Sequence, residues 1–161
     1  MDYEVKRAEI GDLPKILEIY ESARAFMVRA GNPGQWGTTE PKESVLRENI
    51  ADGDLYVLMD GGVIRGCFAF FLKPDPTYAV IEGGRWKSDA PDGVLPRVAG
   101  DGSGGILKAA VEYALQYTDH LRIDTHEKNL PMQRSIRNMG FTYCGIIYLA
   151  NGSPRLAYER I

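Results

Sequence analysis

The alternation of hydrophobic and polar residues predicts a chain of mixed helices and strands. Apolar side chains recur every three or four positions along residues 13–27 and again along residues 106–118, which is the spacing of helices with one buried face. Two shorter helices are expected at residues 41–51 and 129–140, where capping and stop signals occur. Strands are expected at residues 3–10, 55–59, 63–71, 78–82, 121–124, 141–148 and 155–160.

The segments between these elements indicate how the strands pair. Asp60-Gly61-Gly62 separates two apolar strands, which is a hairpin signal and predicts antiparallel pairing. Farther along, the apolar run at residues 94–99, the helix at 106–118 and the strand at 121–124 form a strand–helix–strand unit with parallel strands. We therefore predict one α/β domain over residues 1–161, with a mixed, mostly antiparallel sheet and helices on both faces.

Composition narrows the classes of partner. The 161 residues carry a formal net charge of −3, whereas nucleic-acid binders usually present a basic face. No apolar run approaches the roughly 20 residues that cross a bilayer, and the first residues are charged rather than apolar as in a signal sequence. Cys67 and Cys144 are far apart in apolar runs, so buried free thiols are expected. We predict a cytoplasmic protein without a nucleic-acid, membrane or metal partner.

The most informative stretch is Gly100-Asp101-Gly102-Ser103-Gly104-Gly105, which follows an apolar run and opens a helix. Free amides at a helix N-terminus and glycines without side chains suit phosphate binding. The stretch also reads as GxGxxG, the dinucleotide fingerprint, and Asp124 stands at the spacing of its acidic partner. A dinucleotide fold, however, places this motif after its first strand, and only 56 residues follow Gly105 here. An acyl-CoA pyrophosphate turn is the better interpretation.

The motifs that follow this turn resemble a known family. The chain reads Arg122-Ile123-Asp124-Thr125-His126, then Asn129, Met132-Gln133, and finally Gly140-Phe141 with Tyr143-Cys144-Gly145. In this order they resemble the GNAT superfamily of N-acetyltransferases, and more narrowly its bacterial members with RIDTH-x-x-N-x-x-MQ and GF-x-YCG patterns. The resemblance covers nearly the whole chain. It implies a GNAT-like sheet with an acyl-CoA-binding βαβ unit, and acetyl-CoA as co-substrate.

The resemblance also implies which residues contact the cofactor. The strand before the turn would meet the pantetheine, the turn amides the pyrophosphate, and the start of the last helix the rest of the channel. The residues concerned are Val98, Ala99, Gly102, Ser103, Gly104, Gly105, Ile106, Asn129, Met132 and Gln133.

Several residues are candidates for the chemistry. An attacking amine must lose a proton, and Glu82 and His126 are the candidate bases, each with a structural alternative as a solvated strand end or a turn residue. GNAT enzymes often protonate the leaving thiolate with a tyrosine four residues before the glycine of Gly-Phe, but that position is Ile136 here. The candidate replacements are Tyr143, Cys144, Ser135 and solvent. Cys144 also fits a buried core thiol. The acceptor site is predicted to involve Trp36, Tyr78 and Glu82.

We therefore predict an N-acetyltransferase that moves an acetyl group from acetyl-CoA to a small-molecule or peptide amine by direct attack. A non-catalytic acyl-CoA-binding module is the alternative outside enzymes, because the usual tyrosine is missing. A nicotinamide-dependent oxidoreductase is the alternative within enzymes. The oligomeric state stays open between a monomer and a homodimer.

Overall fold

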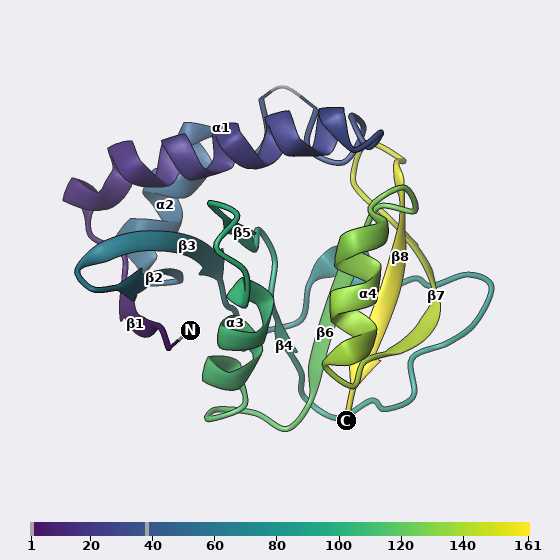
Figure 1. Ribbon diagram of the computed structural model, residues 1–161. Coiled ribbons are helices and arrows are strands. Elements are labelled where there is room, and N and C mark those ends of the chain that lie inside the picture. The colour runs from purple at the N-terminus through teal and green to yellow at the C-terminus, as the bar shows by residue number, and fades with distance from the viewer. Residues whose placement is uncertain (1, 38) are drawn as a thin grey trace.

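The computed structural model describes residues 2–37 and 39–161, and Figure 1 labels its helices and strands. The helices are α1 (Leu13–Arg29), α2 (Glu43–Asp52), α3 (Ile106–Ala114) and α4 (Leu130–Asn138), with short 3-10 helices η1 (Ile10–Asp12) and η2 (Pro76–Tyr78). The strands are β1 (Glu4–Arg7), β2 (Leu55–Asp60), β3 (Val63–Ala69), β4 (Gly93–Val94), β5 (Ala99–Gly100), β6 (Leu121–Thr125), β7 (Thr142–Tyr148) and β8 (Pro154–Arg160).

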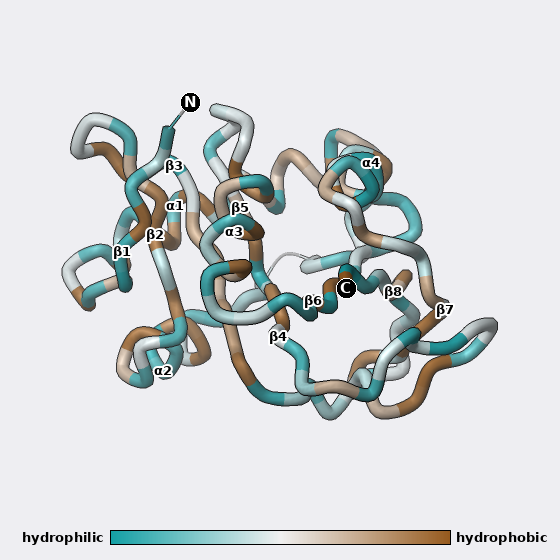
Figure 2. Tube along the Cα trace, turned by 90° about the horizontal axis from the view of Figure 1, so that it is seen from below, coloured by the Kyte–Doolittle hydropathy of each residue, from teal (hydrophilic) through white to brown (hydrophobic). Residues whose placement is uncertain are grey.

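The strands form two groups of four. The first group has the order β1-β2-β3-β5 and is antiparallel throughout, with the predicted hairpin between β2 and β3. The second has the order β4-β6-β8-β7, and its β4 and β6 form the predicted parallel pair. A single antiparallel bridge between Phe71 and Val94 connects the two groups. Figure 2 shows β1, β2 and β3 on one side of the molecule and β6, β7 and β8 on the other, with α3, β4 and β5 between them.

Helices cover both faces of the first group because its strands alternate. Leu55, Val57 and Cys67 pack in one buried cluster with residues of α1 and α2. Tyr56 and Phe68 point the other way and pack in a second cluster with residues of α3, α4, β6 and β8. Each large apolar side chain buried in this way contributes about 1.5–3 kcal/mol. The predicted α/β class, with a mostly antiparallel sheet and helices on both faces, is confirmed.

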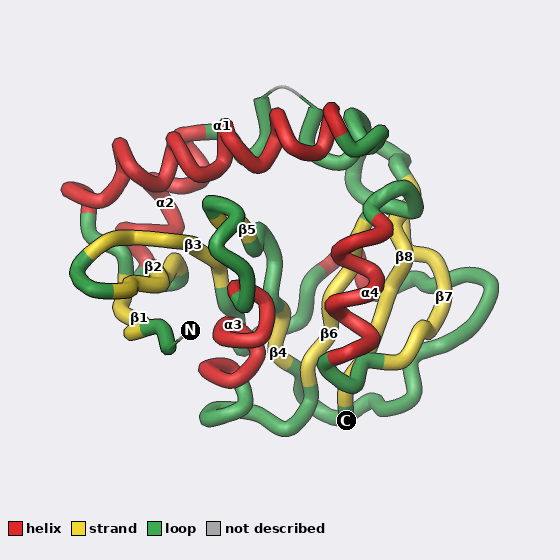
Figure 3. The backbone as a smooth tube through the Cα atoms, in the orientation of Figure 1, coloured by secondary structure: helices red, strands yellow, loops and turns green. Residues whose placement is uncertain are grey.

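The strand predicted at residues 78–82 is wrong. The chain forms η2 at Pro76–Tyr78, where the Asp75 side chain accepts a hydrogen bond from the Thr77 amide at 2.8 Å, and residues 79–81 join no strand. Glu82 makes only one isolated bridge, to Ile146 of β7. The connection from β3 to β4 is otherwise a long loop, drawn green in Figure 3. The helix expected at 41–51 begins two residues later, at Glu43, and ends at Asp52 before the left-handed Gly53.

Over residues 2–37 and 39–161, no helix combines the length and the apolar character that crossing a bilayer requires.

Candidate functional site

The two groups of strands separate where β4 passes into β5. Gly93 and Val94 pair with Leu121 and Arg122 of β6, whereas Ala99 and Gly100 pair with β3. Among the described strands, β6 therefore has no ladder partner beside residues 123–125 on the side that faces β5. A sheet that splits in this way exposes backbone N–H and C=O groups along the split edges.

A cleft of about 780 Å³ lies at this split. Its walls come from the C-terminal half of α1, from β5 and the glycine turn after it, from the start of α3 and from one side of α4. Eight of the ten predicted cofactor residues line it: Val98, Ala99, Gly102, Gly104, Gly105, Ile106, Asn129 and Met132. The other two, Ser103 and Gln133, are not among its lining residues.

The glycine turn leaves open space at the start of α3. Gly102, Gly104 and Gly105 have φ angles of +95°, +84° and +72°, a region that residues with a Cβ rarely adopt. A Cβ built on Gly102 or Gly104 would meet no other atom within 4 Å. Gly105 is the N-cap of α3, and no side chain of the described residues caps the first-turn amides of this helix. Uncapped first-turn amides and the positive end of a helix dipole are features that suit an anion, and here they lie at the rim of the cleft.

Neighbouring side chains hold the turn in place. The Tyr3 hydroxyl donates a hydrogen bond to the Gly104 carbonyl oxygen at 2.6 Å. The Asp101 carboxylate accepts hydrogen bonds from the Ser103 amide and hydroxyl, and Arg65 donates to it at 3.2 Å. Burial alone would raise the pKa of Asp101, but the Ser103 hydrogen bonds and Arg65 outweigh it and lower that pKa. Arg65 thus balances the one acidic side chain that lines the cleft.

The α4 wall of the cleft has a single hydroxyl. Met132 and Ser135 line the cleft, whereas Ile136 is fully buried in the core. Asn129 is the N-cap of α4: its Oδ1 accepts from the Met132 amide at 3.2 Å, and its Nδ2 donates to Gln35 at 2.9 Å. Gln133 is buried, and its side-chain amide donates to the carbonyls of the 126–127 turn. Both amide side chains therefore have structural partners.

The two candidate bases lie outside the cleft lining. Glu82 is exposed, and its carboxylate accepts a hydrogen bond from the Tyr148 hydroxyl at 3.0 Å. The Nδ1 of His126 accepts from the Lys128 amide at 3.1 Å, which places the proton of the neutral ring on Nε2. Burial and the charge of Arg155 lower the pKa of His126, so the ring is neutral at pH 7.

The predicted acceptor residues Trp36 and Tyr78 are also absent from the cleft lining. Trp36 packs edge-on against Tyr20 with ring centroids 5.4 Å apart. Tyr78 is buried, and its hydroxyl donates to Asp124 at 2.7 Å. Burial raises the pKa of both groups of this pair. In the sequence, Asp124 is a dinucleotide marker and part of the motif at residues 122–126, and nothing local shows that η2 brings Tyr78 to it.

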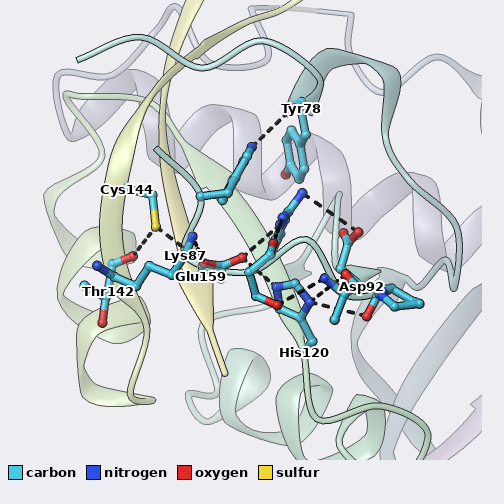
Figure 4. A network of polar contacts seen from close by, with 12 residues as sticks. Tyr78, Lys87, Asp92, His120, Thr142, Cys144 and Glu159 are labelled. Atoms are coloured by element: carbon cyan, nitrogen blue, oxygen red, sulfur yellow. Dashed lines mark hydrogen bonds and ion pairs between the residues drawn. The ribbon is translucent and has the colours of Figure 1, made fainter. Parts of the chain in front are cut away.

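A second polar cluster, which we call the Glu159 network, lies away from the cleft (Figure 4). Glu159 accepts from His120 at 2.5 Å, from Arg122 at 3.1 Å and from the Lys87 amide at 2.7 Å. The network also includes Asp92, which is 3.9 Å from Arg122, and Cys144, whose sulfur is 3.9 Å from Glu159. Among the described residues no group of acidic, histidine or cysteine side chains is arranged to hold a metal ion.

The candidate acids Tyr143 and Cys144 are not among the residues that line the cleft. Cys144 is buried in the Glu159 network, and burial followed by the charge of Glu159 raises the pKa of its thiol. Tyr143 packs edge-on against Tyr158 at 5.7 Å. Of the hydroxyl candidates from the sequence, only Ser135 lines the cleft.

Solved structures provide the comparison with known proteins, because no family model and no curated protein sequence matches this chain. A GNAT-family acetyltransferase from Streptococcus agalactiae superposes with a TM-score of 0.89 at 26% identity, covering 99% of this chain and 95% of that one. The fold is that of the GNAT acetyltransferases.

Two solved structures of lower sequence identity share this fold. Ard1 from Thermoplasma volcanium has a TM-score of 0.69 at 13% identity, over 100% of this chain and 98% of that one. A ribosomal-protein-alanine N-acetyltransferase from Brucella melitensis has a TM-score of 0.60 at 19% identity, over 98% and 99% of the two chains. The GNAT neighbours support an acetyltransferase function in general, and GNAT acetyltransferases use acetyl-CoA as co-substrate.

Proposed function

We propose that the protein transfers an acetyl group from acetyl-CoA to the amine of a small molecule or peptide. The observation that carries this proposal is the cleft at the split sheet, because it joins an anion site at the α3 N-terminus to an edge of free backbone groups. An acyl-CoA needs both features, since it has a pyrophosphate at one end and an amide-rich arm leading to the thioester. The resemblance to bacterial GNAT members with RIDTH-x-x-N-x-x-MQ and GF-x-YCG patterns is part of the same proposal.

The cofactor contacts that the family resemblance implies are part of this proposal. The amides of Gly104, Gly105 and Ile106, together with Gly102 and Ser103, would receive the pyrophosphate. Val98 and Ala99 would pair with the pantetheine arm through their backbone groups. Met132 provides an apolar contact on the opposite wall, and Asn129 and Gln133 would support that wall through the hydrogen bonds described above.

The reaction is proposed to run by direct attack. A neutral amine nitrogen attacks the thioester carbonyl carbon, forming the N–C bond and a tetrahedral intermediate whose oxyanion receives a hydrogen bond from a backbone N–H, which we place at Val98. The intermediate then collapses, the C–S bond breaks and the CoA thiolate leaves. The nitrogen loses one proton and the thiolate gains one, so acetylated amine and CoA are the products.

The proton acceptor is proposed among Glu82 and His126. Glu82 has an exposed carboxylate with a single hydrogen-bond donor, so it has free lone pairs for a proton that arrives through water. His126 would have to exchange its Nε2 proton first, because its Nδ1 already accepts a hydrogen bond. These contacts favour Glu82 as the base and His126 as a donor. Trp36 and Tyr78 stay proposed acceptor contacts on the basis of the sequence.

The proton donor to the thiolate is proposed to be Ser135 or solvent. Ser135 carries the hydroxyl on the α4 wall of the cleft, whereas Ile136 is in the core. Tyr143 and Cys144 stay weaker candidates because neither lines the cleft. The same observation favours a second function, a non-catalytic acyl-CoA-binding module, in which no acid is needed.

Two measurements separate the acetyltransferase, the binding module and the oxidoreductase. Acetyl-CoA should raise the melting temperature and NAD should not; the reverse would favour the oxidoreductase. Thiol-reactive detection of CoA release across a panel of amines then tests transfer, with Glu82→Gln expected to lower kcat at least tenfold and the exposed Glu112→Gln to leave it unchanged. Binding without release for any amine would leave the binding module. We place the activity in the cytoplasm on the sequence arguments above.

A further inference from the structure

The segment that joins β4 to β5 has one residue more than the part of the chain it pairs with, and the two groups of strands separate at this place. Between the bridge at Phe71 and the pair at Cys67, the β3 side advances by four residues. Over the same interval the partner strand advances by five, from Val94 to Ala99. The excess residue makes a β-bulge, and bulges bend the strand that carries them. Arg97 lies inside this bulge with a φ of +58°, the one positive φ recorded for a non-glycine residue in the described chain.

Two side chains from the opposite layer hold Arg97. The Tyr20 hydroxyl of α1 donates a hydrogen bond to the Arg97 carbonyl oxygen at 2.6 Å. The Arg97 guanidinium donates from Nη1 to Oδ1 of Asn49 in α2 at 2.9 Å. Tyr20 is fully buried and Asn49 nearly so, so neither bond competes with bulk water. A residue of α1 therefore fixes the backbone of Arg97, and a residue of α2 fixes its side chain.

We propose that Tyr20 and Asn49 are positioning residues, which keep the bulge at Arg97 formed and thereby aim β5 away from β6. A left-handed arginine persists only where its surroundings fix it, and these two bonds are the polar contacts that do so. Val98 and Ala99 follow directly, so their backbone groups face the cleft only while the bulge holds. The inference rests on the proposed acetyl-CoA site for its functional meaning. Whether Tyr20 and Asn49 keep the bulge formed can be tested without any ligand.

The ligand-free test is amide hydrogen exchange in Tyr20→Phe, which removes one hydroxyl. The amides to follow are Ala69, which donates to Pro96 at 3.1 Å, and Asp101, which donates to Arg65 at 2.9 Å. We expect both to exchange at least tenfold faster, while the β6–β8 ladder is unchanged. Tyr158→Phe is the matched control, because no group of residues 2–37 and 39–161 meets the distance and angle of a hydrogen bond to its buried hydroxyl. Equal acceleration of all amides, or none at these two, overturns the proposal.

The ligand test is calorimetric titration with acetyl-CoA. Tyr20→Phe should raise its Kd at least fivefold and Asn49→Ala about threefold, with Tyr158→Phe within twofold of the wild type. Arg97→Gly is the rescue background, since glycine adopts positive φ without help. Adding Tyr20→Phe to it should change Kd less than twofold, whereas a merely structural tyrosine would cost the same in both backgrounds and so refute the proposal. A wild type that binds no acetyl-CoA refutes the proposed function, while hydrogen exchange still tests whether Tyr20 keeps the bulge formed.

Discussion

The cleft and the Glu159 network put polar groups to opposite uses. Around the glycine turn, no described side chain caps the first amides of α3, and a Cβ on Gly102 or Gly104 would meet no atom within 4 Å. In the Glu159 network, ionisable side chains are buried and bonded to one another, and Glu159 itself is 1% exposed. Perturbed or clustered ionisable residues often mark functional sites, but ion-pair networks inside a fold perturb them as well. Here the free backbone donors mark the candidate site, and the charged cluster supports the fold.

The largest expected effect comes from breaking the Glu159 network. Glu159→Ala leaves His120 and Arg122 without their carboxylate in a buried place, so the free energy of unfolding should fall by about 3–5 kcal/mol in denaturant titrations. Glu112→Ala is the control, because its pair with Lys108 is exposed on α3 and is worth well under 1 kcal/mol. The affinity of the folded variant for acetyl-CoA should stay within twofold. Unchanged stability would mean that the cluster does not support the fold.

The next effect comes from placing a charge in the glycine turn. Gly104→Asp should weaken acetyl-CoA binding at least tenfold relative to Gly104→Asn, about 1.4 kcal/mol, since the carboxylate repels the pyrophosphate. Asn and Asp are similar in size and both tolerate positive φ, so the pair isolates the charge. Titration calorimetry with each variant measures it. Equal affinities would place the pyrophosphate elsewhere.

A smaller effect on stability is expected when the pH is lowered. Burial alone would raise the pKa of Glu159, but hydrogen bonds from His120 and Lys87 and the bond from Arg122 outweigh it and hold that pKa below 4.5. A depressed carboxyl pKa stabilises the fold above 4.5, and the contribution is lost as pH falls through the folded value. The stability gap between the wild type and Glu159→Gln should therefore narrow from pH 6 to pH 3.5. A gap that stays constant or widens would contradict this linkage.

The smallest effect is expected at the cysteines. Burial raises the pKa of Cys67 to about 12, and burial with Glu159 raises that of Cys144, so both thiols should react with alkylating reagents only after unfolding. Cys144→Ala should lower the free energy of unfolding by about 1 kcal/mol and leave acetyl-CoA affinity and CoA release unchanged. Loss of turnover in that variant, with binding intact, would restore Cys144 as the acid.

Local patterns predicted most of the fold. The helical spacing at residues 13–27 corresponds to α1, and Asp60-Gly61-Gly62 lies at the β2–β3 hairpin. The pattern at residues 78–82 failed, because the Asp75 side chain caps η2 (Pro76–Tyr78) and residues 79–81 join no strand. The close approach of this loop to β7 was also hidden, since it depends on Gly145. A Cβ there would stand 2.6 Å from the Glu82 carbonyl oxygen.

The sequence predicted the site unevenly for a related reason. Glycines between a strand and a helix signal the turn directly, and the turn lines the cleft. The hydrogen bond from Tyr20 to Arg97 joins residues 77 positions apart. The bulge is found only when the residue numbers of two paired strands are compared. Side-chain roles such as those of Glu82 and Cys144 depend on which face of which element each residue occupies, and residue type alone does not specify this.

The bond between Tyr3 and Gly104 has a practical consequence for handling the protein. It brings the third residue to the rim of the cleft, 101 positions away in the sequence, and the start of the described chain lies near α3 in Figure 1. An affinity tag or fusion partner joined upstream of Tyr3 would therefore crowd the turn, and its charges would distort measured affinities. Ile161 is exposed at the opposite end of the described chain, beyond β8. Purification handles and surface-immobilisation linkers belong there.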